Sequence, residues 1–250
     1  MKTAQQLLET HTTLALRKAL AEMTKTVCII QARMGSTRFP GKVLADICGK
    51  PMLARVIDRV VRCPEIDQII VAMPRTPDNQ MLWRWCQQEQ IPHFRGDEED
   101  VLARYDDCAK SFGATIVVRI TADCPLIDPA LISACILSFR HVQPPADYVS
   151  NISPVRTYPD GLDVEVFSAA ALSKARMWCV TPSEREHVTP FLQKDPRFRT
   201  YNLRHTRDLS ALRWTVDTPE DLAFVRRLYV ALTMPFSWQQ ILAFTQEQDV

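Results

Sequence analysis

The sequence predicts an α/β fold with a mostly parallel sheet and helices on both faces. Short apolar runs at 27–30 and 69–72 lack polar alternation, which is typical of strands buried on both faces, and 115–120 is predicted as a third strand. Segments with helical spacing at 51–63 and 80–90 separate these runs. Because strands and helices alternate in this way over the first 120 residues, a parallel sheet is expected.

Two parts of the chain are predicted from the pattern. Residues 1–25 form an amphipathic helical extension, in which leucines recur at 7, 8, 14, 16 and 20. Charged residues such as Glu9, Arg17 and Glu22 interrupt the apolar positions, so we expect no secretion signal. Residues 26–250 are long enough for a single α/β domain with a large core.

Composition argues against two classes of partner. Lys and Arg number 30 against 29 Asp and Glu, a net charge of +1, so no overall basic field indicates nucleic-acid binding. No apolar run approaches the roughly 18 residues of a membrane span. The eight cysteines include no C-x-x-C pair, so neither a zinc site nor a redox motif is indicated, and a cytoplasmic location is expected.

The loop after the first strand is the strongest candidate binding site. Gly35 and Gly41 permit backbone conformations that direct several N–H groups toward one point. Arg33, Arg38 and Lys42 place three cations around the same turn. This combination suits a polyanion, above all a nucleoside triphosphate. The alternative is a surface turn with scattered basic residues.

Two known phosphate loops do not match this segment. A Walker loop has four residues between its glycines, whereas five separate Gly35 from Gly41, and Val43 stands where a magnesium-binding hydroxyl belongs. The three-glycine dinucleotide motif is also missing.

Two aspartates follow predicted strands. Asp123 stands directly after the strand ending at 120, where it suits a magnesium ligand or, alternatively, a cap. A later predicted strand ends at Asp217. Thr218, with Asp221 three residues on, predicts a capping box for the helix beginning at Pro219. That would leave the Asp217 carboxylate available to share a metal with Asp123.

Three further residues are candidates for contacts with a second substrate. Asp163 and Glu165 alternate with apolar residues, so we expect them on one strand face, where they could bind sugar hydroxyls, a cation or a metal. The alternative is a solvated face. His187 lies in a helix predicted at 182–192, without the spacing of a zinc site.

Six motifs, taken in order, resemble the cytidylyltransferase family, most closely its SpsF-like branch, to which CMP-sugar-acid synthetases are related. They are QARMGSTRFPGKVL (31–44), RGDEEDVLARY (95–105), RITADCPLID (119–128), DGLDVEVF (160–167), SEREHVTP (183–190) and RWTVDTPEDL (213–222). One departure is Thr121-Ala122-Asp123, where the Kdo synthetases have Gln-Gly-Asp. This departure puts in question the base contacts that the glutamine makes in those enzymes, and with them the preference for cytosine.

The resemblance implies a Rossmann-like nucleotide-diphospho-sugar transferase fold. It also implies transfer of CMP from CTP to a sugar acid or related acceptor, with release of pyrophosphate, in surface polysaccharide or glycan precursor biosynthesis. Mg²⁺ held by Asp123 and Asp217 would be the cofactor, and a homodimer is possible. The nucleotide-binding residues would be Gln31, Ala32, Arg33, Met34, Gly35, Ser36, Arg38, Lys42 and Thr121, the catalytic residues Arg33, Lys42, Asp123 and Asp217, and the acceptor-side candidates Asp163, Glu165 and His187.

Other functions remain open at this point. A metal-dependent glycosyltransferase of similar fold would favour a D-x-D motif, but Asp160 and Asp163 are three residues apart. A polyol phosphate or sugar phosphate could replace the sugar acid as acceptor. A non-catalytic relative would be expected to have lost a loop cation or a metal carboxylate, and none is lost.

Overall fold

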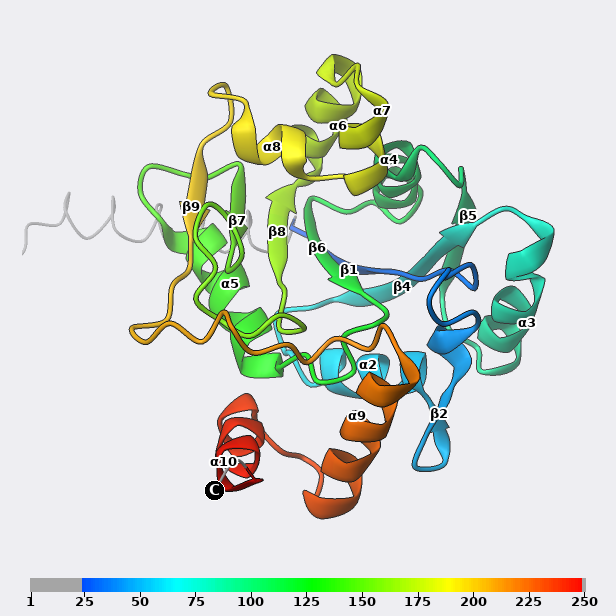
Figure 1. The fold of residues 1–250 in the computed structure, drawn as a ribbon. Coiled ribbons are helices and arrows are strands. Elements are labelled where there is room, and N and C mark those ends of the chain that lie inside the picture. The colour runs from blue at the N-terminus through cyan, green and yellow to red at the C-terminus, as the bar shows by residue number, and fades with distance from the viewer. Residues whose placement is uncertain (1–23, 249–250) are drawn as a thin grey trace, which may run out of the picture.

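The computed structural model describes residues 24–248, which form an α/β domain around a seven-stranded sheet (Figure 1). The strand order is β5-β4-β1-β6-β8-β7-β9, and within this sheet only β8 runs opposite to the others. The predicted fold class is therefore confirmed. The strands are β1 (Thr26–Gln31), β4 (Gln68–Pro74), β5 (His93–Gly96), β6 (Ile116–Thr121), β7 (Tyr148–Ser150), β8 (Glu165–Ser168) and β9 (Thr200–Asn202), and β2 (Asp46–Ile47) and β3 (Lys50–Pro51) form a separate hairpin.

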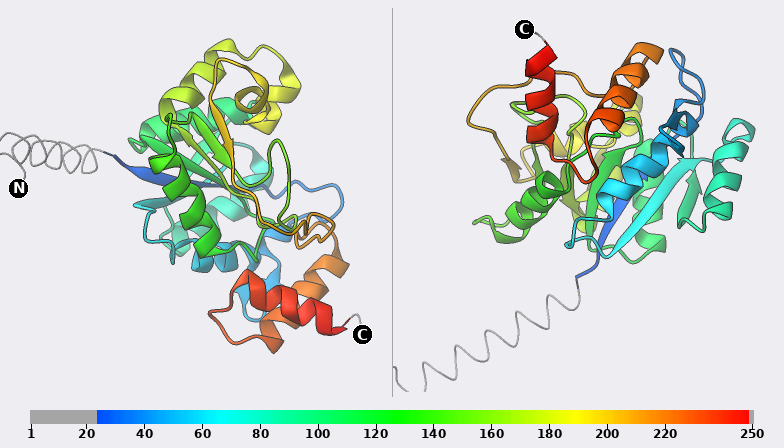
Figure 2. Two further views of the ribbon diagram at one scale, coloured as in Figure 1. Left: turned by 90° about the vertical axis from the view of Figure 1, so that its left-hand side faces the viewer. Right: turned by 90° about the horizontal axis from the view of Figure 1, so that it is seen from below.

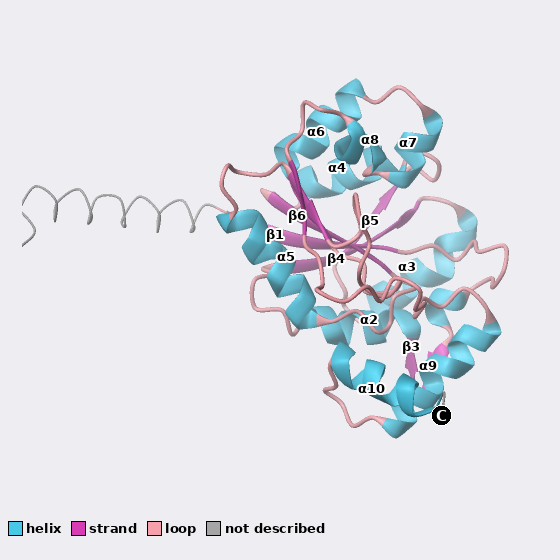
Figure 3. Cartoon of the chain, turned by 60° about the vertical axis from the view of Figure 1, so that its left-hand side comes forward, coloured by secondary structure: helices cyan, strands magenta, loops and turns pink. Residues whose placement is uncertain are grey.

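Helices cover both faces of the sheet (Figure 3). On one face, α4, α6 and α8 contribute to a core with Val27 and Ile29 of β1. On the other, α2, α5, α9 and α10 pack in a core with Cys28 and Ile30. Figure 2 places α9 and α10 on the same side of the sheet as α2. The helices are α2 (Met52–Val60), α3 (Gln80–Gln88), α4 (Val101–Ser111), α5 (Pro129–His141), α6 (Ala169–Trp178), α7 (Pro182–His187), α8 (Pro190–Lys194), α9 (Pro219–Ala231) and α10 (Trp238–Gln248), with 3₁₀ turns η1 (Lys42–Leu44) and η2 (Pro77–Asn79).

Strand β1 has the burial that its apolar run predicts. Its residues Val27 to Ile30 are all 0% exposed, and they alternate between the two cores. It pairs in parallel with β4 on one side and β6 on the other. The chain thus leaves β1 in one direction and returns on its other side, and ligands of open α/β sheets bind at the carboxyl edge beside such a reversal.

Two predicted elements differ from the structure. The helix expected over 182–192 is divided into α7 and α8, because Val188 adopts φ +70° and Pro190 has no N–H to continue a helix. The strand expected before Asp217 is instead an extended segment, joined to the 158–163 turn by one isolated bridge between Asp160 and Arg213.

The predicted helix at 1–25 lies outside the described residues except for its last two positions. The single-domain boundary at residue 26, the homodimer and the cytoplasmic location stay predictions. Within residues 24–248, no helix is both long enough and apolar enough to cross a membrane.

Candidate active site

The glycine-containing loop after β1 is fixed at both ends. The Met34 N–H donates to Asn79 Oδ1 over 2.9 Å, and the Gly41 N–H donates to the Met34 carbonyl over 2.9 Å. Gly41 adopts φ +75°, a conformation that favours glycine, and this turn leads directly into η1. The conformation of Gly41 therefore positions Lys42, the first residue of η1, directly after the loop.

Lys42 joins the two aspartates that follow separate parts of the chain. Its Nζ donates to Asp123 Oδ2 over 3.0 Å, to Asp217 Oδ1 over 2.8 Å and to the Val216 carbonyl over 2.8 Å. Arg38 Nη2 lies 3.0 Å from the other Asp217 oxygen, Oδ2. Arg213 Nη1 lies 3.7 Å from the same oxygen. Two carboxylates and three cations thus form one cluster at the carboxyl edge of β1 and β6.

Local backbone contacts bring Asp217 to this position. The Val216 N–H donates to the Asp123 carbonyl over 2.9 Å, which holds the two segments together. Thr218 caps α9 and forms the predicted capping box with Asp221. Because Asp221 also accepts from the Asp217 N–H, over 2.8 Å, the Asp217 carboxylate is not used as a cap and faces Lys42.

The pKa values indicate that the Lys42–Asp123 pair is ionised. Burial by itself would lower the pKa of Lys42, but the adjacent Asp123 and Asp217 raise it above its usual value. Burial would likewise raise the pKa of Asp123, yet the Lys42 charge and hydrogen bonds from Thr121 and Lys42 lower it. Lys42 is therefore protonated and Asp123 deprotonated at neutral pH, in a site that is partly open to solvent.

A cavity of about 260 Å³ opens above this cluster. All the predicted nucleotide-binding and catalytic residues line it except Ala32, which is buried, and Met34, which contributes its backbone to the loop. Three residues that sequence reasoning did not single out also line it, each next to a predicted one along the chain. The lining is Gln31, Arg33, Gly35, Ser36, Thr37, Arg38, Lys42, Val43, Thr121, Ala122, Asp123 and Asp217.

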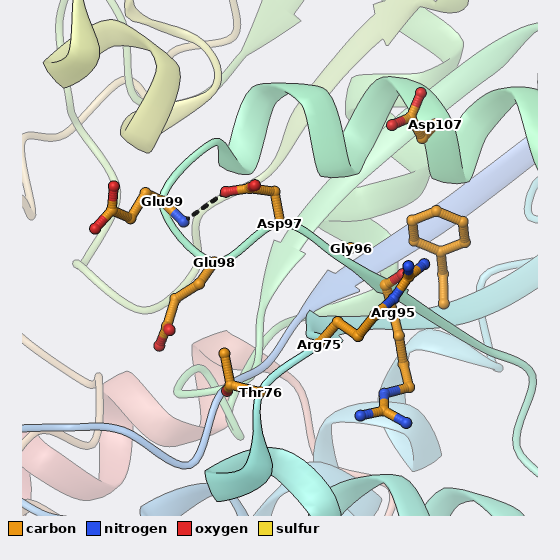
Figure 4. Close-up of a pocket in the computed structure, with 9 residues that line it drawn as sticks. Arg75, Thr76, Arg95, Gly96, Asp97, Glu98, Glu99 and Asp107 are labelled. Carbon is orange, nitrogen blue, oxygen red and sulfur yellow. Dashed lines mark hydrogen bonds between the residues drawn. The ribbon is translucent and has the colours of Figure 1, made fainter.

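Two larger cavities lie around the loop between β5 and α4. Arg33 also lines a cavity of about 510 Å³, whose other residues are Glu98, Glu99, Asp100, Val180, Pro182, Arg185 and Glu186. Glu98 and Glu99 in turn line a third, of about 560 Å³, with Arg75, Thr76, Phe94, Arg95, Gly96, Asp97 and Asp107 (Figure 4). The 510 Å³ cavity thus shares Arg33 with the first cavity and Glu98 and Glu99 with the third. Residues 95–100 of the 95–105 motif, to which the sequence assigned no role, line these two larger cavities.

The loop at 96–99 is held from beneath by Arg104. This side chain is 1% exposed and donates to the carbonyls of Asp97 and Glu98. A Cβ at Gly96 would lie 2.6 Å from Arg104 Cγ, so a glycine is needed for this close approach. Figure 4 shows the Glu99 N–H donating to the Asp97 side chain, over 2.9 Å, which further fixes the turn.

The expectation that Asp163 and Glu165 share an open strand face is wrong. Asp163 precedes β8, which begins at Glu165. Glu165 is 1% exposed, and its carboxylate accepts from Arg119, Tyr148 and Gln193. It presents no free oxygen to a ligand. Both Asp163 oxygens accept from Arg156, which contacts Asp160 as well.

His187 lies apart from the cluster. Its residue is exposed at the end of α7, whereas its neighbours Arg185 and Glu186 line the 510 Å³ cavity and His187 does not. The structure thus brings together the triphosphate-loop and metal candidates, and it does not bring Glu165 or His187 to them.

The carboxylates fit a magnesium ion only in a shared site. Within the described residues, no group of three or more His, Cys, Asp or Glu side chains could hold a metal. Mg²⁺ is commonly bound by one or two carboxylates, with substrate phosphates and water completing the shell. Asp123 and Asp217, converging beside a cation-lined cavity, match that partial donor set.

Comparison with known proteins identifies the family. The family model described as cytidylyltransferase matches residues 27–249. The chain is 30% identical over 215 residues to the spore coat polysaccharide biosynthesis protein SpsF of Bacillus subtilis (83% of this chain, 87% of SpsF), and 29% identical over 245 residues to a 3-deoxy-manno-octulosonate cytidylyltransferase of Solibacter usitatus (83% and 95%). A solved cytidylyltransferase structure from Leptospira borgpetersenii aligns with a TM-score of 0.85 at 29% identity, covering 90% of this chain and 95% of that one. Together with the ordered motifs and the shared fold, these matches show that the chain belongs to the cytidylyltransferase family.

Proposed function

We propose that the protein transfers CMP from CTP to a sugar acid or related acceptor and releases pyrophosphate. One observation carries the proposal: Lys42, Asp123 and Asp217 meet at the base of a cavity whose rim carries Arg33 and Arg38. Phosphoryl and nucleotidyl transfer depend mainly on positioning and on stabilisation of charge. A cluster of this kind supplies both.

The roles of the residues follow from their places. Arg33, Arg38 and Lys42 would neutralise the triphosphate, and the loop with Ser36 and Gly35 would surround it. Because Arg33 also lines the 510 Å³ cavity beside Glu98 and Glu99, we infer that the nucleoside binds on that side. The α-phosphorus would then lie near Asp123, where an acceptor oxygen attacks in line with the departing pyrophosphate.

Asp123 and Asp217 would hold Mg²⁺ together with phosphate oxygens. When bound, the ion supplies a Lewis acid that offsets charge on the transferring phosphoryl group. Lys42 and Arg33 would stabilise the negative charge that accumulates on pyrophosphate as it leaves.

The class of acceptor is taken from the relatives. The Solibacter usitatus relative carries 3-deoxy-manno-octulosonate in its name, and SpsF is named for polysaccharide biosynthesis. We therefore propose a sugar acid as acceptor, in the synthesis of surface polysaccharide or another glycan precursor. Asp163 remains an acceptor-side candidate only if Arg156 releases it.

Pyrophosphate release tests the proposal. The assay combines the protein with Mg²⁺, each of the four nucleoside triphosphates and a panel of sugar acids, sugar phosphates and polyol phosphates. We expect release with CTP and a sugar acid, and its loss in Lys42→Ala. Lys50→Ala is the matched control, because Lys50 is exposed and, among residues 24–248, forms an ion pair with Asp58 alone. Release with a phosphorylated acceptor would change the acceptor class, and release with another triphosphate would overturn cytidylyl transfer.

A further inference from the structure

We propose that Lys42 is the resident counter-ion of the Asp123–Asp217 pair, so that the metal site becomes available only when a triphosphate draws Lys42 away. The proposal takes one point from the proposed function, namely that a triphosphate is the anion that enters the cavity. Lys42 would then occupy the metal site before nucleotide binds, and it would stabilise charge during the reaction.

All three N–H donors of the Lys42 ammonium have acceptors within the site. A protonated lysine carries three N–H donors, and here they are matched by three oxygens: Asp123 Oδ2, Asp217 Oδ1 and the Val216 carbonyl, at 2.8–3.0 Å. The side chain is 9% exposed. Lys42 therefore contacts a phosphate only by giving up at least one of these partners.

The ammonium also occupies the position that a metal ion requires. It lies between the two carboxylates and contacts one oxygen of each, Asp123 Oδ2 and Asp217 Oδ1. Mg²⁺ would need oxygens at about 2.0–2.1 Å, so the ion and the ammonium compete for the same space between them. Both cannot be bound there at once.

Charge makes the competition stronger. In the cluster, the two carboxylates lie beside Lys42, beside Arg38 at 3.0 Å from Asp217 Oδ2, and beside Arg213 at 3.7 Å from the same oxygen. A divalent ion added to this cluster would face these cations at close range in a partly buried site, which is unfavourable. A triphosphate changes the balance, because its negative charges can pair with Lys42 and Arg38, while Arg213 keeps Asp221 as a partner.

Lys42 and Arg38 differ in how readily they can move. The Arg38 side chain is 64% exposed and is held in this cluster by a single ion pair, whereas Lys42 has all three partners inside the site. We therefore expect Arg38 to contribute less than Lys42 to the exclusion of metal in the absence of nucleotide.

The test is a Mn²⁺ titration of the full chain without nucleotide or acceptor, followed by electron paramagnetic resonance of free Mn²⁺. We expect weak binding by the wild-type protein and binding at least about tenfold tighter in Lys42→Met, because one competing charge is removed. Lys50→Met, which removes an exposed lysine charge elsewhere, should bind like wild type. The double variant Lys42→Met/Asp217→Asn should lose the gain, which would locate the ion at the carboxylates.

Equal Mn²⁺ affinity in wild type and Lys42→Met would overturn the proposal, as would a gain that persists in the double variant. If Lys42→Met does not fold, Arg38→Gln serves instead, since Arg38 is largely exposed. It should tighten nucleotide-free Mn²⁺ binding by a few-fold, and no change in that variant would count against the proposal. The titration contains no CTP, so its outcome is separate from that of the pyrophosphate assay.

Discussion

Two groups of charged residues differ in their exposure to solvent. One lies at the carboxyl edge of β1 and β6, and the other lies inside the β6–β8–β7 half of the sheet. Lys42, Asp123 and Asp217 contact one another beside a cavity, and the two aspartate side chains are 30% and 22% exposed. Glu165 pairs with Arg119 and Tyr148 in the sheet interior at 1% exposure. An ion pair next to an opening can exchange its partners for a ligand, whereas an enclosed pair serves the fold. The three predictions below test this distinction.

The largest effect is expected at the open cluster. Asp123→Asn should reduce pyrophosphate release by at least about 10²–10³-fold, because a preorganised charge at the reacting phosphate is lost. The variant should remain folded, since the Asp123 side chain is 30% exposed and its backbone contact with Val216 is unaffected. Enzyme kinetics and circular dichroism measure the two properties. Near-wild-type turnover in a folded variant would refute the site assignment.

A smaller effect, on stability, is expected at the enclosed pair. Glu165→Gln should lower the free energy of unfolding by about 3 kcal/mol, because the Arg119 charge is left without its carboxylate. Urea unfolding measures the loss. Asp163→Asn is the comparison variant, and its loss should be less, since Arg156 is 28% exposed and retains Asp160 nearby. A Glu165→Gln protein with unchanged stability and an altered acceptor KM would reverse the distinction drawn here.

The smallest effect is expected at Asp106, which links α4 to α6 through Arg176 and Ser173. Burial would raise the pKa of Asp106, but Lys110, Ser173 and Arg176 together lower it. Its stabilising contribution is therefore complete above the unfolded pKa of about 3.9 and is lost as the pH falls through the lower folded value. Asp106→Asn should cost about 1–2 kcal/mol at pH 7, as hydrogen bonds to a charged group are lost.

The pH dependence separates this effect from a loss of packing. The stability difference between wild type and Asp106→Asn should shrink as the pH is lowered below about 4. Thermal unfolding at several pH values measures it. A difference that stays constant down to acid pH would show that the Asp106 charge does not contribute.

Local patterns predicted the fold and much of the candidate site. The apolar run of β1 and the capping box at Thr218 depend on neighbouring residues, and the structure contains both. The expected exposure of Glu165 failed because its partner Arg119 is 46 residues away and its strand is covered on both faces, which alternation alone does not reveal. The break at Val188 and the extended segment before Asp217 likewise depend on tertiary contacts.

The separation of the cluster along the chain has a consequence for biosynthesis. Lys42 is followed by Asp123 after 81 residues and by Asp217 only after 175. Contacts between such distant residues form late in folding. On the ribosome, the N-terminal strands and the glycine-containing loop emerge long before the second carboxylate is synthesised. A nascent chain therefore carries an incomplete candidate site, which is assembled only once the segment at 216–217 has docked against the end of β6.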